Sequence, residues 1–167
     1  GYLGVEFAKW TFYVRVSTGD SFVIPVAIAI AIGRIGCLLY GCCYGVATNQ
    51  DWGLRFSAAE DGGLLLRHPA QLYEFAFHVV FACAASYGIR KGKAARHWMI
   101  LYLIAYATFR FFSESWRPEP RLAGGLTFYQ WSSLGIGVGF TALLLWRLHV
   151  EKMTIRLIKD PESKIGL

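Results

Sequence analysis

The chain has 167 residues, of which 55% are hydrophobic, 16% aromatic and only 17% charged. Four long apolar segments in so short a chain would leave too little polar surface to cover them in water, which argues against a soluble globular protein. The formal net charge of +6 comes from basic segments that flank the apolar ones, so it gives no independent support to nucleic-acid binding.

The apolar segments approach the ~20 residues that a bilayer-spanning helix needs. In chain order they cover residues 22–40, 69–89, 98–116 and 126–146, and residues 1–14 are long enough only for the end of a fifth. The chain begins inside apolar sequence, without Met or a signal-peptide pattern, and we therefore read it as the C-terminal part of a longer protein.

Basic residues in the connections orient these spans, because cytoplasmic loops collect Lys and Arg. They crowd residues 90–96 and the segment after Trp146, which places both inside and leaves the loops at 42–68 and 117–125 outside. We expect one transmembrane domain over residues 1–149 and a basic cytoplasmic tail over residues 150–167. The predicted fold is all-α, a polytopic transmembrane helix bundle with a lipid-accessible cavity that opens outward.

The first motif is GRIGCLLYGCCYG, at residues 33–45 near the outer end of the first full span. A mid-span arginine costs roughly 2.5 to 3.5 kcal/mol, so Arg34 is expected to face a partner, a cavity or a substrate. The glycines, among them Gly36 and Gly45, allow close backbone approach or a helix break whose free N–H groups face an anion. The alternative is small-residue helix packing with an arginine that reaches the interface.

The second motif, RHPAQLYE at residues 67–74, begins the next span with His68 near its cap and Pro69 in its first turn. Gln71, Glu74 and His78 recur at three and four residues and so share one helix face. A single polar stripe on an apolar helix is typical of a face turned to the bundle interior. Glu74 and His78 could also form a purely structural pair.

The third motif is FRFFSESWRPEP, at residues 109–120. Arg110 and Glu114 are four residues apart and can pair, and Arg117 follows within a turn or two. Arginines at headgroup depth provide the fork geometry that phosphate recognition favours. The pairing could instead be structural.

In chain order, GRIG, RHPAQLYE, a Tyr and an Arg ahead of FFSESWR, and GGLTFYQW resemble the prolipoprotein diacylglyceryl transferase family, bacterial inner-membrane enzymes of lipoprotein maturation. The likeness extends over nearly the whole chain, to about Trp146, and RHPAQLYE is its most specific part.

The resemblance implies transfer of the diacylglyceryl group of phosphatidylglycerol to the lipobox cysteine thiol of a prolipoprotein, with glycerol phosphate as the leaving group. It implies a multi-pass protein among the lipids of the bacterial plasma membrane, with its site toward the outer half and its C-terminus in the cytoplasm. No metal, cofactor or nucleic acid is implied.

Such a site must hold a phosphate, stabilise its growing charge and help to deprotonate a thiol. We predict a catalytic group of Arg34, His68, Glu74 and Arg110. The predicted substrate-binding positions are Gly36, Cys37, Cys42, Gly45, Gln71, Tyr73, Tyr106, Glu114, Arg117 and Gln130.

The chain departs from the family pattern after GRIG, where the family has Asn, Asn and Glu and this sequence has Cys37, Tyr40 and Cys42. Val46 stands where an Arg is usual. The family's His-Gly-Gly motif, with a catalytic His, is expected just upstream of Gly1.

Cys37, Cys42 and Cys43 lie toward the oxidising outer side, where a disulfide is allowed. Either Cys42 or Cys43 could form a stabilising disulfide with Cys37, or the cluster could provide a redox thiol or a covalent acceptor. Cys83, in the middle of a span, is expected only to pack against its neighbours. No CxxC spacing or nearby His supports zinc. The alternative functions are a thiol-active membrane oxidoreductase and a non-catalytic relative that binds lipid.

Overall fold

The computed structural model describes residues 7, 10–13, 19–94 and 96–159, and this part of the chain is helical apart from its loops. Most of the segment predicted to end a further span, residues 1–14, lies outside the described residues. The elements, in chain order, are α2 (Gly19–Tyr40), α3 (Ala70–Arg90), α4 (Trp98–Ser113), the short 3-10 helices η1 (Glu114–Trp116) and η2 (Ala123–Gly125), and α5 (Phe128–Lys159).

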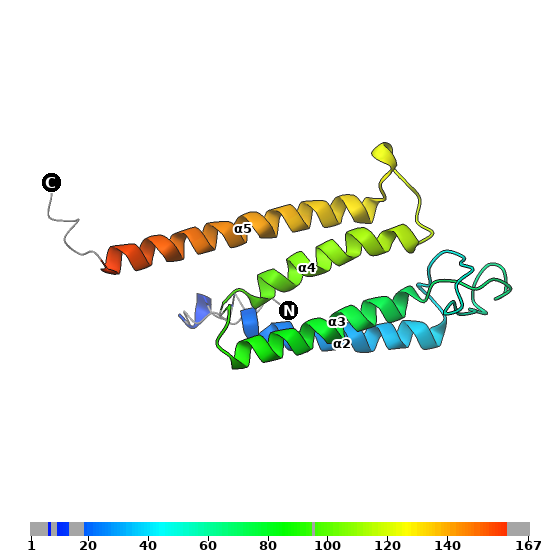
Figure 1. Ribbon diagram of the computed structural model, residues 1–167, viewed down its shortest axis with the longest axis horizontal. Helices are drawn as coiled ribbons and strands as arrows, with labels where there is room; N and C mark the ends of the chain where they lie inside the picture. Colours follow the sequence, from blue (N-terminus) through cyan, green and yellow to red (C-terminus); the bar gives the residue numbers. More distant parts are fainter. Residues whose placement is uncertain (1–6, 8–9, 14–18, 95, 160–167) are drawn as a thin grey trace.

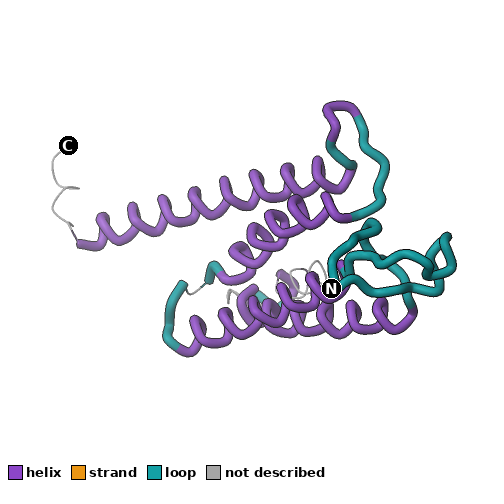
Figure 2. Tube along the Cα trace, turned by 45° about the vertical axis from the view of Figure 1, so that its right-hand side comes forward, coloured by secondary structure: helices purple, strands orange, loops and turns teal. Residues whose placement is uncertain are grey.

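The helices form layers, with α2 and α3 side by side, α4 in the middle and α5 outermost (Figure 1). Figure 2, turned by 45°, keeps this order and shows loops gathered at the two ends. The connection from α2 to α3 and the one from α4 to α5 lie at the same end. The three sequence motifs therefore meet at one end of the bundle, as the alternating topology predicts.

In the part of the chain that the structure describes, three helices are long and apolar enough to cross a membrane: Asp20–Tyr40, Ala70–Arg90 and Phe128–Arg156. α4 has 16 residues and runs directly into η1, so the two together cover the predicted span at 98–116. The all-α membrane bundle predicted from the sequence is confirmed. α5 is longer than its predicted span and continues past the predicted boundary at residue 149 to Lys159. The basic cytoplasmic tail stays a prediction.

Small side chains let α2 and α3 approach closely in the half of the bundle away from the motifs. Ala27, Ala82 and Ala85 are buried together with Val23 and Tyr102. Such alanines permit the backbone proximity on which helix packing in membranes depends. At the same end, the Asp20 carboxylate accepts hydrogen bonds from the backbone N–H groups of Arg96 and Met99, and so ties α2 to the start of α4.

Within the described part of the chain, the predicted close backbone approach is found at one glycine of the first motif, Gly45, and not at Gly33 or Gly36. α2 continues unbroken through Gly33 and Gly36, and among the described residues nothing lies within 4 Å of a Cβ placed on either. The helix ends just before Gly41, which has a φ of +78°. Close approach occurs at Gly45, where a Cβ would lie 2.6 Å from the Trp116 carbonyl oxygen and 2.8 Å from the Cβ of His68.

Backbone hydrogen bonds join the ends of three helices around Gly45. Gly45 N–H donates to the His68 carbonyl at 2.8 Å, and Val46 N–H donates to the Trp116 carbonyl at 2.7 Å. The loop after α2 is thereby attached both to the residue before Pro69 and to η1. This attachment holds the three motifs in a fixed relation.

Candidate functional site

Glu74 is the centre of the polar group at the motif end. Its Oε1 accepts from Arg34 Nη2 at 2.8 Å and from the Tyr106 hydroxyl at 2.6 Å, and its Oε2 lies 3.9 Å from Arg110 Nη1. Glu74 is buried, with 3% of its surface exposed. The three partners come from α2 and α4, so one α3 carboxylate joins three helices.

A second carboxylate extends this group toward α5. Glu114 Oε2 accepts from Arg110 Nη2 at 3.0 Å, which confirms the predicted pairing, and Thr127 Oγ1 lies 3.5 Å from Glu114 Oε1. The Arg110 guanidinium also lies over the Tyr129 ring, 5.7 Å from its centroid. Arg117 is half-buried just beyond η1, and its charge acts on Glu114.

The predicted polar stripe on α3 faces the interior, because Gln71, Glu74 and His78 are all buried. His78 Nδ1 lies 3.0 Å from the Tyr102 hydroxyl, so this imidazole is hydrogen-bonded to α4 rather than paired with Glu74. Gln71 Nε2 donates to the Cys42 carbonyl at 2.6 Å. Gln71 Oε1 and His78 Nε2 are buried polar atoms with no partner among the described residues.

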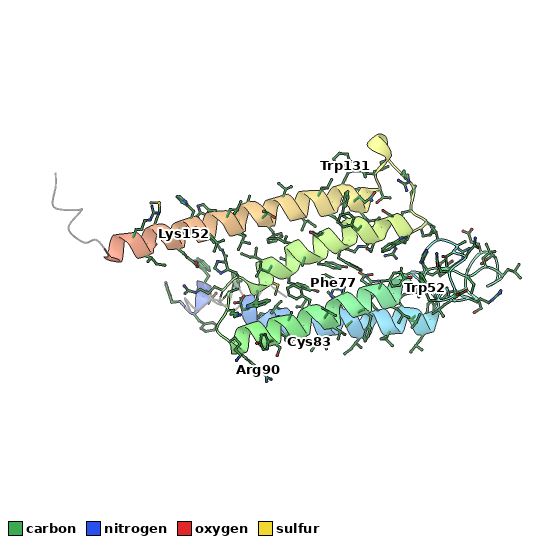
Figure 3. All side chains as sticks on the ribbon, in the orientation of Figure 1. Trp52, Phe77, Cys83, Arg90, Trp131 and Lys152 are labelled. Carbon is green, nitrogen blue, oxygen red and sulfur yellow. The ribbon has the colours of Figure 1, made fainter. Side chains whose placement is uncertain are left out.

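His68 and Tyr73 lie in an aromatic cluster at the bundle end. His68 Nδ1 is 3.1 Å from the Tyr73 hydroxyl, which also accepts from Trp52 Nε1 at 3.1 Å. The Trp116 ring packs against both, with centroids 6.2 Å from His68 and 5.7 Å from Tyr73. Figure 3 shows Trp52 in the loop between α2 and α3, at this end of the molecule.

Gln130 caps α5. Its Oε1 accepts from Thr127 N–H at 3.0 Å, and its own N–H donates to Thr127 Oγ1 at 3.2 Å, which is the reciprocal capping box of a T-x-x-Q sequence. Gln130 Nε2 donates to the Phe111 carbonyl at 3.2 Å and links α5 to α4. Both polar ends of this side chain are therefore occupied. The T-x-x-Q spacing was visible in the sequence and identifies this role.

Three thiols converge just after α2. The Sγ atoms of Cys37, Cys42 and Cys43 all lie within 4.8 Å of one another. Cys37 and Cys42 are half-buried and Cys43 is exposed. Burial, followed by hydrogen bonding with the other two thiols, raises the pKa of Cys42 to about 11.

An apolar groove of about 580 Å³ lies between α4 and α5. Its walls include Ala107, Phe111 and Phe112 of α4 and Gly137 and Val138 of α5. This volume is within the range of roughly 300–1,000 Å³ typical of ligand pockets. Among the described residues that line it, only Ser133, Thr108 and Thr141 are polar, so the groove suits an apolar chain.

This arrangement combines cationic forks with an apolar wall. Glu74 holds Arg34 through Nη2, and Arg110 is held through Nη2 by Glu114 and through Nη1 by Glu74. Arg34 Nε is buried without a partner among the described residues. Guanidinium groups held in this way suit a phosphate, which accepts two parallel N–H bonds. Chemically, the arrangement can bind a phosphate whose attached chains are apolar.

Sequence comparisons support the same chemistry. The family model described as prolipoprotein diacylglyceryl transferase matches residues 1–146. A phosphatidylglycerol–prolipoprotein diacylglyceryl transferase of Pseudoalteromonas atlantica is 33% identical, over 92% of this chain and 59% of the relative. The enzyme of the same name from Legionella pneumophila strain Corby is also 33% identical, over 87% of this chain and 57% of its own length.

A third relative of that name, from Mannheimia succiniciproducens, is 36% identical over 77% of this chain and 47% of its own length. The chain thus spans less than two thirds of the length of these relatives.

Proposed function

The chain belongs to the prolipoprotein diacylglyceryl transferase family, and on that premise we propose that it carries the headgroup-binding centre of an enzyme that lipidates prolipoproteins. The donor is phosphatidylglycerol and the acceptor is the lipobox cysteine of a prolipoprotein. The observation that carries the proposal is the buried Glu74 carboxylate held between Arg34 of α2 and Arg110 of α4.

The two arginines bind the phosphate of the donor. The acceptor sulfur attacks the glyceryl carbon that bears the phosphate, the carbon–sulfur bond forms, and the carbon–oxygen bond to phosphate breaks. The leaving glycerol phosphate gains one negative charge, which fixed guanidinium groups stabilise more strongly than the starting diester. This difference in charge is the main source of catalysis.

The thiol proton must also leave, because a free cysteine with a pKa near 8.5 is mostly protonated at neutral pH. Arg34, Arg110 and Tyr106 surround the Glu74 carboxylate, whose role is to position the arginines. The leaving phosphate, whose second pKa is about 6, is the stronger acceptor of the proton. His68 contacts Tyr73 and Trp116 rather than the two arginines, so we assign its predicted catalytic role to the prolipoprotein thiol and not to the phosphate.

The apolar groove between α4 and α5 takes an acyl chain of the donor. Phe111 and Val138 line it, and we place one chain of the bound lipid along these two residues. The groove wall is almost entirely apolar, with Ser133, Thr108 and Thr141 as its hydroxyl-bearing residues. Burying such a chain contributes about 0.8 kcal/mol per methylene.

We place this centre in the outer half of a bacterial inner membrane, with the C-terminus in the cytoplasm. The basic residues at 90–96 lie at the end of the bundle opposite the motifs, and Arg90 and Lys152 mark that end in Figure 3. Cytoplasmic loops carry such an excess of Lys and Arg. Single cysteines in a cysteine-free variant test this: an impermeant maleimide should label residue 52 but not residue 93 in spheroplasts, and the reverse pattern would refute the orientation.

Complementation tests the transferase activity. A strain depleted of its own transferase should survive with the unaltered protein, and a lipobox cysteine should acquire a diacylglyceryl thioether detectable by mass spectrometry. Arg34→Gln and Arg110→Gln should each lower transfer by about 100-fold or more, corresponding to roughly 2.7 to 4 kcal/mol for a charge-stabilising group. Arg156→Gln, an exposed change at the far end of α5, is the matched control and should transfer normally.

Two results would contradict the proposal. The first is normal transfer by both arginine variants at normal protein levels. The second is lipid binding without a thioether product, which would favour the non-catalytic relative. Turnover of disulfides without lipid transfer would instead favour the thiol-active oxidoreductase.

A further inference from the structure

The three-thiol cluster of Cys37, Cys42 and Cys43 takes no part in the proposed lipid transfer. Two of its members stand where the family pattern has Asn and Glu, so two polar positions have both become soft sulfur ligands. Family membership does not account for a replacement of this kind. The cluster therefore calls for its own chemical explanation.

The backbone at the end of α2 brings the thiols together. Gly41 N–H and Cys42 N–H both donate to the Cys37 carbonyl, at 3.0 and 3.1 Å, and the positive φ of Gly41 turns the chain back over the last helical turn. Cys43 also has a positive φ, of 62°. The four-residue spacing between Cys37 and Cys42 does not by itself predict this chain reversal.

A buried side chain fixes the middle ligand from outside the loop. Gln71, 1% exposed on α3, donates to the Cys42 carbonyl at 2.6 Å. The helix holds Cys37, and Gln71 holds Cys42. Gln71 thereby fixes the backbone position from which the Cys42 thiol projects.

The sulfur spacing suits a shared ion. Metal–thiolate bonds of about 2.3 Å in a trigonal site place the sulfurs roughly 4 Å apart, and small side-chain rotations bring sulfurs within 4.8 Å of one another to that spacing. Among the described residues no carboxylate or imidazole joins the three sulfurs. Zinc usually takes four ligands in structural sites, whereas all-sulfur coordination selects soft ions.

We propose that Cys37, Cys42 and Cys43 form a three-thiolate site for a soft, filled-shell cation, with Cu(I) as the best match. Binding replaces three thiol protons, which pass to solvent, by one ion, and no electrons are transferred. A disulfide between Cys37 and Cys42 would use two of these sulfurs and leave Cys43 unexplained. The exposed Cys43 provides the entry route for the ion.

A competition titration tests the site. The reduced protein, purified in detergent without oxygen, is titrated with Cu(I) against a coloured Cu(I) chelator. We expect one ion per chain, an ultraviolet sulfur-to-metal charge-transfer band, and an X-ray absorption spectrum fitted by sulfur ligands alone. Serine at any one of the three positions should weaken binding by about tenfold or more.

Cys83→Ser is the matched control, because Cys83 lies within α3 away from the loop (Figure 3) and should leave Cu(I) binding unchanged. Cys43→Ser changes an exposed side chain, so helical content and unfolding temperature should match those of the parent in the metal-free state. A loss of binding in that variant then reports ligand removal rather than misfolding.

Three outcomes would overturn the proposal. One is the absence of retained Cu(I), and another is equal affinity in parent and serine variants. The third is recovery of an intact Cys37–Cys42 disulfide from membranes alkylated before extraction. Retention of Zn(II) in preference to Cu(I) would overturn the choice of ion.

Discussion

Arg34 donates to Glu74 over 2.8 Å although 40 positions separate them in the chain. This contact joins α2 to α3 at the motif end. Because only 4% of the Glu74 side chain is exposed, the carboxylate depends on its cationic partners. The pair is therefore both a structural joint and the support of the proposed phosphate site.

A double-mutant cycle measures this joint. Arg34→Gln and Glu74→Gln should each lower the free energy of unfolding, by roughly 2–4 kcal/mol for Glu74→Gln because it leaves two guanidinium groups without their shared anion. The double variant should lose less than the sum, with a coupling energy of roughly 1–3 kcal/mol. Chemical denaturation in detergent provides the values. Additive losses would show that the two side chains act independently.

Removing the Tyr106 hydroxyl should affect the rate of transfer more than the stability of the protein. Tyr106→Phe deletes the donor to Glu74 Oε1 but keeps the ring, and should lower transfer by about tenfold with a stability loss of about 1–2 kcal/mol. Tyr102→Phe is the control, because its hydroxyl contacts His78 and not Glu74. Initial rates of thioether formation distinguish the two. Equal rate losses in both variants would remove the special role of Tyr106.

Gly45 should tolerate no side chain. Gly45→Ala places a methyl group against the Trp116 carbonyl and His68, and should destabilise the protein by roughly 1–3 kcal/mol as other over-packed sites do. Gly33→Ala, where the described residues leave open space, should be neutral or stabilising by up to about 1 kcal/mol. Thermal unfolding compares the two. A neutral Gly45→Ala would mean that the loop readily moves away from η1.

The capping box at the start of α5 should contribute measurable stability. Thr127→Ala removes the acceptor for Gln130 N–H and should cost about 1 kcal/mol. Ser132→Ala, whose exposed hydroxyl bonds only the Phe128 carbonyl within the same helix, should change stability by less than about 0.5 kcal/mol. Denaturant midpoints give both values. Identical midpoints would exclude the cap as a source of stability.

Acid should loosen the loop between α2 and α3, because this loop contains Asp61. Partial burial raises the pKa of Asp61. The hydrogen bonds from the Leu65 and Gly63 N–H groups and the charge of Arg67 together lower this pKa by more, so the net shift is downward from 3.8. A carboxyl with a lowered folded-state pKa stabilises the loop above its unfolded pKa, and this stabilisation disappears as pH falls through the folded value. Trp52 fluorescence should report loosening below about pH 4. Asp61→Asn should abolish that transition.

The sequence predicted the helices well because hydropathy and length decide them. The segments at residues 22–40 and 69–89 match α2 and α3 to within a few residues. The stripe of Gln71, Glu74 and His78 and the Arg110–Glu114 pair followed from helical spacing, which is local. The end of α5 was placed too early, since the basic segment after Trp146 is polar on average yet continues the helix to Lys159.

Contacts that depend on loop geometry were not predictable in the same way. Convergence of the thiols requires the positive φ of Gly41, and the Trp52–Tyr73 contact requires the path of the whole α2–α3 loop. The glycines at 33 and 36 matched a packing pattern, but the neighbour that would explain them is absent among the described residues. The spacing of residues along a helix predicts which side chains share a face, but it does not predict which segment of the chain packs against that face.

The hydrogen bonds donated by Gly45 and Val46 tie together the ends of α2, α3 and α4 at the motif end, so that these ends form one unit. α5 is attached to this unit chiefly through α4 and the Gln130–Phe111 hydrogen bond. A displacement of any one of these three helix ends is therefore transmitted to the other two through backbone hydrogen bonds.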